Sequence, residues 1–372
     1  MLRNIFKNYW RNIDKSILFG FLLLFLLGIF FSFASTSSLA GERLDKNYYF
    51  FFYKHSLFAL VSISLMFFVS AIKTDFIKKS FLPLFLILLI SLVMVPFIGV
   101  EVKGSKRWLD LFFFRFQPIE FLKPFFVLVI AKMLSLDQFK TTKTSYFYSF
   151  LILLFLIIFL INQPDIGQSI LLITTWIAIV FISGINLLYI FSFLGISILS
   201  ISALLIIFPD KFGYITKRIE VFLDPSKGDS FQSQKALDAI KEGGLTGQGM
   251  GEGILKDSVP EAHTDYIISV ITEEFGSIIA ILLVSIFLYI SFKIIKKSVI
   301  EKNKFLKISL CGLSTILIFQ TFIHIGVNSG LLPTTGMTLP FLSYGGSSMI
   351  GSAILAGVIL NFTKKSFLDE DF

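Results

Sequence analysis

Long apolar runs are the feature that most constrains how this chain folds. Two examples are "ILFGFLLLFLLGIFFSF" at 17–33 and "FLILLFLIIFLI" at 150–161. A helix needs about 20 consecutive apolar residues to cross a bilayer. Hydrophobic residues make up 55% of the 372 residues, and the mean hydropathy is +0.82. The sequence therefore predicts an integral membrane protein. It contains no nucleic-acid-binding motif, so we expect no nucleic-acid partner and attribute the net charge of +8 to membrane topology.

About ten segments have the length and apolarity of a membrane-spanning helix. With the N-terminus inside, Lys and Arg concentrate in the segments that face the cytoplasm, which is the usual bias. We therefore predict an all-α polytopic membrane protein, a single domain over 1–372 with both termini cytoplasmic. The expected spans lie near 16–34, 55–72, 80–98, 117–134, 147–163, 167–184, 187–208, 265–292, 306–328 and 346–362.

One outer segment, about 209–264, is far longer than an ordinary connection, and such loops are usually functional or disordered. It contains the glycine-rich stretch "EGGLTGQGMGEG". This stretch has no Gly-Lys-Ser/Thr, and its glycines miss the third position of the dinucleotide fingerprint. We therefore exclude a nucleotide site and expect a long extracytoplasmic loop with a flexible or tightly turned glycine-rich part.

A second outer segment, "GVEVKGSKRWLDLFFFRFQPIE", carries Lys106, Arg107 and Trp108 on the side where basic residues are disfavoured. An aromatic residue beside an arginine is consistent with a plain membrane anchor. It is equally consistent with a grip on phosphate, which the forked guanidinium suits.

Ionisable residues within or beside apolar spans are functional candidates. Glu120 and Lys123 in "QPIEFLKP" are three apart, so they share one helix face. They form either an internal ion pair or a site in which Glu120 orients Lys123 toward an anionic ligand. Asp165 in "NQPDIGQ" follows a proline between two apolar runs, where it either caps the next helix or serves the site.

The stretch "PEAHTDYI" places Glu261, His263 and Asp265 directly before the eighth span. Asp265 or the threonine before it is a candidate N-cap for that helix. A cap leaves Glu261 and His263 unexplained, and it leaves Glu273 and Glu274 unexplained two turns deeper. Further along, "NSGLLPTTGMTLPFLSYGGSS" joins the last two spans, and irregular backbone at that depth must be buried in protein or line a wet cavity. The single cysteine, in an apolar run, excludes a disulfide framework and a cysteine-based metal site.

Taken in order, these blocks resemble the bacterial shape, elongation, division and sporulation (SEDS) family, to which RodA, FtsW and SpoVE belong. The resemblance extends from the first span to the last. "GVNSGLLPTTGMTLPF" and "EEFG" look more like the division member FtsW than like RodA. The chain departs from the family pattern at Ile119, Tyr266 and, relative to division members, Thr335.

The resemblance implies a peptidoglycan glycosyltransferase that polymerises lipid II into glycan strands at the outer face of the cytoplasmic (inner) membrane, for septal wall synthesis. It implies a class B penicillin-binding protein and other division proteins as partners. A divalent cation, Mg²⁺ or Mn²⁺, is the one cofactor left open, and its ligands are unknown. The family's essential acid falls on Asp265. The expected substrate-binding residues are Glu120, Lys123, Arg107, Lys106, Trp108, Asp165, Arg218, Glu261, His263 and Ser343.

In this interpretation Asp265 is the base that takes a proton from the attacking sugar hydroxyl. Lys123, Arg107 and Arg218 stabilise the leaving pyrophosphate. Three alternatives remain: a lipid II flippase, a non-catalytic scaffold and an elongation-type, RodA-like polymerase. Transport predicts charged residues that reach both leaflets around a midplane site, whereas the distinctive charged blocks here gather toward the outer face.

Overall fold

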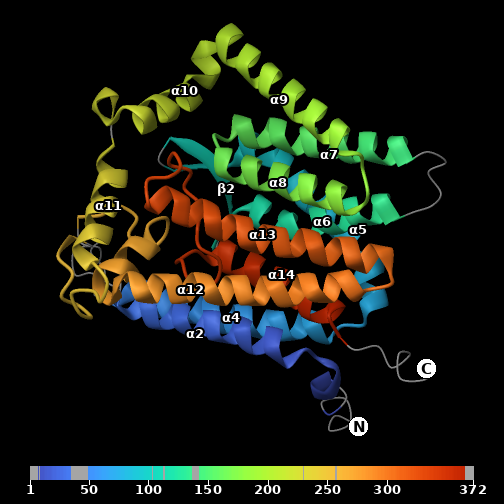
Figure 1. Ribbon diagram of the computed structural model, residues 1–372, viewed down its shortest axis with the longest axis horizontal. Coiled ribbons are helices and arrows are strands. Elements are labelled where there is room, and N and C mark those ends of the chain that lie inside the picture. Colours follow the sequence, from blue (N-terminus) through green and yellow to red (C-terminus); the bar gives the residue numbers. More distant parts are fainter. Residues whose placement is uncertain are drawn as a thin grey trace.

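The computed structural model describes residues 7, 9–34, 49–102, 104–111, 114–135, 142–228, 230–255 and 258–364, and the chain is mostly helical there (Figure 1). Each of the ten expected spans coincides with a helix, which confirms the predicted fold class. These helices are α2 (Lys15–Ala34), α4 (Phe50–Ala71), α5 (Thr74–Ile98), α6 (Pro118–Ser135), α7 (Thr142–Asn162), α8 (Ile166–Ile182), α9 (Leu187–Ile207), α12 (Ile267–Ile300), α13 (Lys304–Asn328) and α14 (Gly346–Phe362).

Within the described residues, six helices are long and apolar enough to cross a membrane: α2, α4, α5, α7, α12 and α13. Helices α8 and α14 are apolar but shorter. Helix α6 differs because it carries Glu120, Lys123 and Lys132, and yet most of its residues are buried among other helices. The charges of Glu120 and Lys123 are tolerated because protein, and not lipid, surrounds them, whereas Lys132 is exposed near the far end of the helix.

Helix α14 runs beside α4 although the two are far apart in the sequence (Figure 1). Gly357 allows the close approach, since a methyl group there would lie only 2.7 Å from the Cβ of Val69. Near the end of α14, the Asn361 amide donates to the carbonyls of Ser70 (3.0 Å) and Ile72 (2.6 Å), where α4 ends. A helix leaves its last carbonyl groups unpaired, and Asn361 thereby supplies a donor to two carbonyls at the end of α4.

The segment 209–264 was expected to be one long outer loop, and the expectation of a loop is wrong in part. It contains α10 (Pro209–Leu223), the short 3-10 helix η1 (Pro225–Lys227) and α11 (Phe231–Gly243). Helices α10 and α11 mix polar and apolar residues, so neither forms the apolar run that marks a span. Helix α11 packs on α12, while α9 and α10 lie at the margin of the bundle (Figure 1).

The glycine-rich stretch is tightly turned, with Gly244, Gly247 and Gly251 all in the left-handed region. It packs against a kink in α12 at Gly276, whose φ of 83° interrupts the helix. A second unexpected element is a three-stranded antiparallel sheet of β1 (Val100–Val102), β2 (Ser105–Asp110) and β3 (Arg115–Phe116), in that order. The sequence did not reveal it because its strands are only two to six residues long.

Candidate functional site

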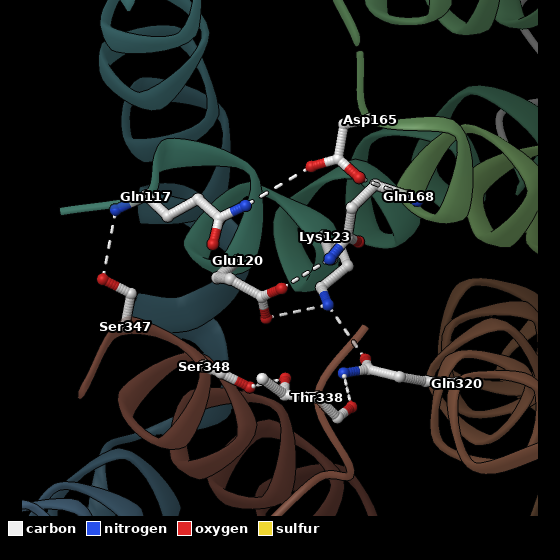
Figure 2. A network of polar contacts seen from close by, with 9 residues as sticks. All are labelled: Gln117, Glu120, Lys123, Asp165, Gln168, Gln320, Thr338, Ser347 and Ser348. Carbon is white, nitrogen blue, oxygen red and sulfur yellow. Dashed lines mark hydrogen bonds and ion pairs between the residues drawn. The ribbon is translucent and has the colours of Figure 1, made fainter. Parts of the chain in front are cut away.

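A buried ion pair lies at the start of α6. Glu120 and Lys123 are each only 3% exposed, and Lys123 Nζ lies 2.9 Å from Glu120 Oε2 (Figure 2). Gln168 Nε2 donates to the other carboxylate oxygen at 2.5 Å, and Lys123 Nζ also donates to Gln320 Oε1 at 2.9 Å. Buried charges are costly unless they are paired and hydrogen-bonded. The structure thus contains the internal ion pair, which was the first of the two interpretations of Glu120 and Lys123.

Asp165 caps α8, as one of its two predicted roles required. Its Oδ1 accepts from the backbone amide of Gln168 at 3.4 Å, and its Oδ2 accepts from Gln117 Nε2 at 3.4 Å (Figure 2). The side chain is buried, and this desolvation raises its pKa, against the opposing effect of the nearby Arg107 guanidinium. The cap therefore also places a carboxyl group beside a cation.

Arg107 projects inward from β2 and is 9% exposed. Its Nε donates to the carbonyl of Gln163 at 3.0 Å, and its guanidinium also donates to the carbonyl of Pro164. Lys106 is exposed and Trp108 is half-buried. Successive residues of a strand point to opposite faces, so the expected Lys-Arg-Trp group is divided: Arg107 joins Asp165, and Lys106 and Trp108 face the other way.

Asp265 lies in the turn before α12, next to Gly336 of the segment between α13 and α14. A methyl group on Gly336 would lie 3.4 Å from Asp265 Oδ2 and 3.8 Å from an Arg107 terminal nitrogen. A carboxylate and a guanidinium therefore border the same small volume. The N-cap of α12 is Tyr266, so the predicted cap at Asp265 or the preceding threonine is wrong. The reason is the turn: backbone amides 264–266 donate to the Glu261 carbonyl, which delays the start of the helix.

Three further candidates hold this turn in place. Ser343 Oγ donates to the carbonyl of Thr264 at 2.6 Å and accepts from the amide of Leu339 at 2.8 Å. The His263 ring lies 4.5 Å from the ring of Phe51, between centroids. The side chain of Glu261 accepts from the Thr264 hydroxyl at 2.8 Å. Glu261, His263 and Ser343, which were expected to bind substrate, thus shape the turn that carries Asp265.

Arg218 reaches the same region from α10. Its guanidinium donates to the carbonyl of Thr334 at 3.1 Å, two residues before Gly336. Burial lowers the pKa of Arg218, and the positive charge of Arg107 lowers it further. Two arginines from distant segments therefore act on each other and on Asp165.

Sequence reasoning missed the neutral polar residues of the site, because amides and hydroxyls within apolar runs carry no charge to draw attention. One pattern could have revealed some of them: Gln320, His324 and Asn328 are four apart on α13. Three of the missed residues contact the charged ones directly: Gln117, Gln168 and Gln320 (Figure 2). Thr338, Ser347 and Ser348 extend the network through Gln117, Gln320 and each other. No group of three or more His, Cys, Asp or Glu that could hold a metal occurs among the described residues.

These features define a polytopic membrane protein in which charged and amide side chains from distant helices and loops converge on one site. The chain belongs to the FTSW/RODA/SPOVE family, described as a cell cycle protein, which matches residues 14–367. This confirms the resemblance.

Curated relatives cover nearly the whole chain. "Probable peptidoglycan glycosyltransferase FtsW" of Haemophilus influenzae is 33% identical over 99% of this chain and 96% of its own length. The protein of the same name from Geobacter sp. (strain M18) is 34% identical, with 95% and 97% covered.

Solved structures show the same fold. A chain of a peptidoglycan synthase complex that coordinates polymerization and crosslinking matches with a TM-score of 0.77 at 24% identity, over 94% of this chain and 97% of that one. Rod shape determining protein RodA of Thermus thermophilus matches with a TM-score of 0.69 at 21% identity, over 94% and 96%.

Proposed function

We propose that this protein is a peptidoglycan glycosyltransferase that polymerises lipid II at the outer face of the cytoplasmic membrane, for septal wall synthesis. The observation that carries the proposal is that the Asp265 carboxylate and the Arg107 guanidinium border the same small volume beside Gly336. Relatives that match nearly the whole chain bear the name "Probable peptidoglycan glycosyltransferase FtsW", which supports both the reaction and the division role.

In the proposed reaction a sugar hydroxyl attacks the anomeric carbon of a sugar that carries a pyrophosphate-linked lipid. Asp265 takes the hydroxyl proton, the new glycosidic C–O bond forms, and the bond from the anomeric carbon to the pyrophosphate oxygen breaks. The base contributes about 10²- to 10⁴-fold to such a step. The charge that develops on the pyrophosphate is stabilised by Arg107 and Arg218.

The remaining candidates take supporting places. Lys106 and Trp108 lie on the outward side of β2, where an arriving head group would pass. Asp165 holds Arg107 by its charge, while Glu120 and Lys123 lie deeper and also act on the Asp165 carboxyl. Glu261, His263 and Ser343 fix the turn that carries Asp265. A class B penicillin-binding protein is the proposed partner, in keeping with the fold shared with a chain of a synthase complex.

The decisive experiment is polymerisation of labelled lipid II by the purified protein, with and without a class B penicillin-binding protein. We expect glycan strands from the unaltered protein and a loss of about 10²-fold or more in Asp265→Asn. Asp210→Asn, which changes an exposed acid at the start of α10, is the matched control and should retain full activity. Normal polymer from Asp265→Asn would reject Asp265 as the base. Transport of lipid II across vesicles without any polymer would favour a flippase instead.

A further inference from the structure

Three polar side chains form a row along one face of α13. Gln320, His324 and Asn328 are four residues apart, so they lie one above another on the helix. Their exposed fractions are only 2%, 1% and 0%. A buried polar group is costly unless it is hydrogen-bonded. Each member of the row therefore needs a partner inside the protein.

Each of the three side chains has a backbone carbonyl as one partner. That carbonyl belongs either to the 334–339 segment or to the turn before α12, the two segments that meet at the candidate site. Gln320 Nε2 donates to the Thr338 carbonyl at 3.0 Å, and His324 Nδ1 lies 2.7 Å from the Met337 carbonyl oxygen. Since a carbonyl only accepts, Nδ1 carries the hydrogen. Asn328 Nδ2 donates to the carbonyl of Asp265 itself, at 3.0 Å.

The far ends of the two amides are also occupied. Gln320 Oε1 accepts from Lys123 Nζ at 2.9 Å (Figure 2), and Asn328 Oδ1 accepts from Ser269 Oγ at 2.8 Å. An amide presents a donor on one side and an acceptor on the other. The Thr338 carbonyl therefore directs the Gln320 oxygen toward Lys123, and the buried ion pair is joined to the 334–339 segment through one side chain.

The position of this segment matters because Gly336 borders Asp265 and Arg107. Thr338, which Gln320 holds, is only two residues from Gly336, and its hydroxyl is 2.5 Å from that of Ser348 on α14. A shift at Thr338 would be transmitted to Gly336 and would change the volume in which the reacting atoms must lie.

We propose that Gln320 is a positioning residue: with His324 and Asn328 it fixes Gly336 relative to Asp265, and Lys123 acts on the site through Gln320 without touching substrate. The inference rests on the proposed function in so far as Asp265 is the base. It assigns the buried ion pair a task in shaping the site, instead of in binding the pyrophosphate.

The first test separates the two hydrogen bonds of Gln320. Gln320→Leu removes both, whereas Gln320→Glu keeps an acceptor for Lys123 and loses the donor to Thr338. Thr321→Val is the matched control, because the buried Thr321 hydroxyl bonds to the Leu317 carbonyl of its own helix. We expect both Gln320 variants to lower kcat for lipid II polymerisation by about 10²-fold, with KM nearly unchanged. Full kcat in Gln320→Glu would overturn the positioning role.

A double-mutant cycle tests the route from Lys123. If Lys123 acts through Gln320, the double variant Lys123→Met/Gln320→Leu should polymerise lipid II at least as fast as the less active of the two single variants. If Lys123 contacts substrate directly, the two losses multiply, and that outcome would reject the proposal.

Hydrogen–deuterium exchange provides a readout that needs no activity. Backbone amides of 334–339 should exchange faster in Gln320→Leu than in the unaltered protein, and at the unaltered rate in Thr321→Val. Unchanged exchange in Gln320→Leu would refute the inference. Faster exchange in a protein that makes no polymer with its partner would reject the proposed function and keep the positioning role. If Gln320→Leu does not accumulate, Gln320→Glu serves for the same comparison.

Discussion

The buried ammonium group of Lys123 is stabilised by two oxygen atoms of neighbouring side chains. Its ammonium has a carboxylate oxygen of Glu120 and an amide oxygen of Gln320 at 2.9 Å each. Removing one member of such a buried pair leaves an uncompensated charge, which typically costs about 3–5 kcal/mol, whereas replacing both by apolar residues is often neutral. The pair is therefore sensitive to single changes and tolerant of a matched double change.

We predict that Glu120→Leu and Lys123→Met each lower the free energy of unfolding by about 3–5 kcal/mol, and that the double variant regains most of the loss. Thermal unfolding of the purified variants in detergent measures these changes in the free energy of unfolding. Lys132→Met, at the exposed far end of α6, should have little effect and serves as the control. Additive losses in the double variant would show that the two residues are not energetically paired.

The kink in α12 shows how one element is shaped by another. Gly276 in α12 and Gly247 in the glycine-rich stretch approach so closely that a methyl group on either would overlap backbone of the other segment. Above the kink, Glu273 Oε1 accepts from the amide of Leu255 at 2.7 Å, and Glu274 Oε1 accepts from that of Gly251 at 3.3 Å. Glu274 thus holds the glycine-rich stretch against the helix, and Glu273 holds the residues that directly follow it.

Gly276→Ala should destabilise the protein more than Gly251→Ala does. Both glycines have left-handed backbone, with φ of 83° and 86°. A positive φ strains an alanine at both sites, by about 1–3 kcal/mol. At Gly276 the added methyl group would overlap the carbonyl of Leu245, whereas at Gly251 an added methyl group would lie in open space. Melting temperatures of the two variants measure the difference, and equal losses would show that strain alone matters.

At the scale of the whole molecule, the contacts identify two opposite ends. Asp14 before α2 lies 3.7 Å from Lys297 near the end of α12, and Lys364 after α14 lies over the ring of Tyr9. These groups mark one end, which we assign to the cytoplasm because it is rich in lysine. The turn before α12 then lies at the outer end, with Asp265.

Single cysteines test this assignment in a background with Cys311→Ser. Gln234→Cys on α11 and Lys302→Cys after α12 replace exposed side chains at the proposed outer and inner ends. On intact spheroplasts, a membrane-impermeant thiol reagent should label position 234 and leave 302 unlabelled until the membrane is permeabilised. The opposite pattern would place Asp265 in the cytoplasm and reject the proposed reaction there.

Much of the architecture could be predicted, because crossing a bilayer demands long apolar runs and such runs are visible in a sequence. The charged members of the site could be predicted too, since charge in an apolar setting needs compensation. The division of Lys106 from Arg107 depends on a short strand formed by pairing with neighbours. The four-residue spacing of Gln320, His324 and Asn328 is visible in the sequence, but the partners of these side chains depend on which loop lies against α13. Both are tertiary effects that local patterns do not encode.

The pairing of α4 with α14 has a consequence for how the protein is made. The hydroxyl of Thr74, just after α4, donates to Asn361 of α14, 287 positions later. During synthesis α4 enters the membrane long before its partner exists, so its buried face must meet lipid or the insertion machinery for most of translation. Assembly around α4 is consequently completed late, when α14 is inserted. A chain that ended before α14 would contain nearly all its spans, but the face of α4 that packs against α14 would remain uncovered.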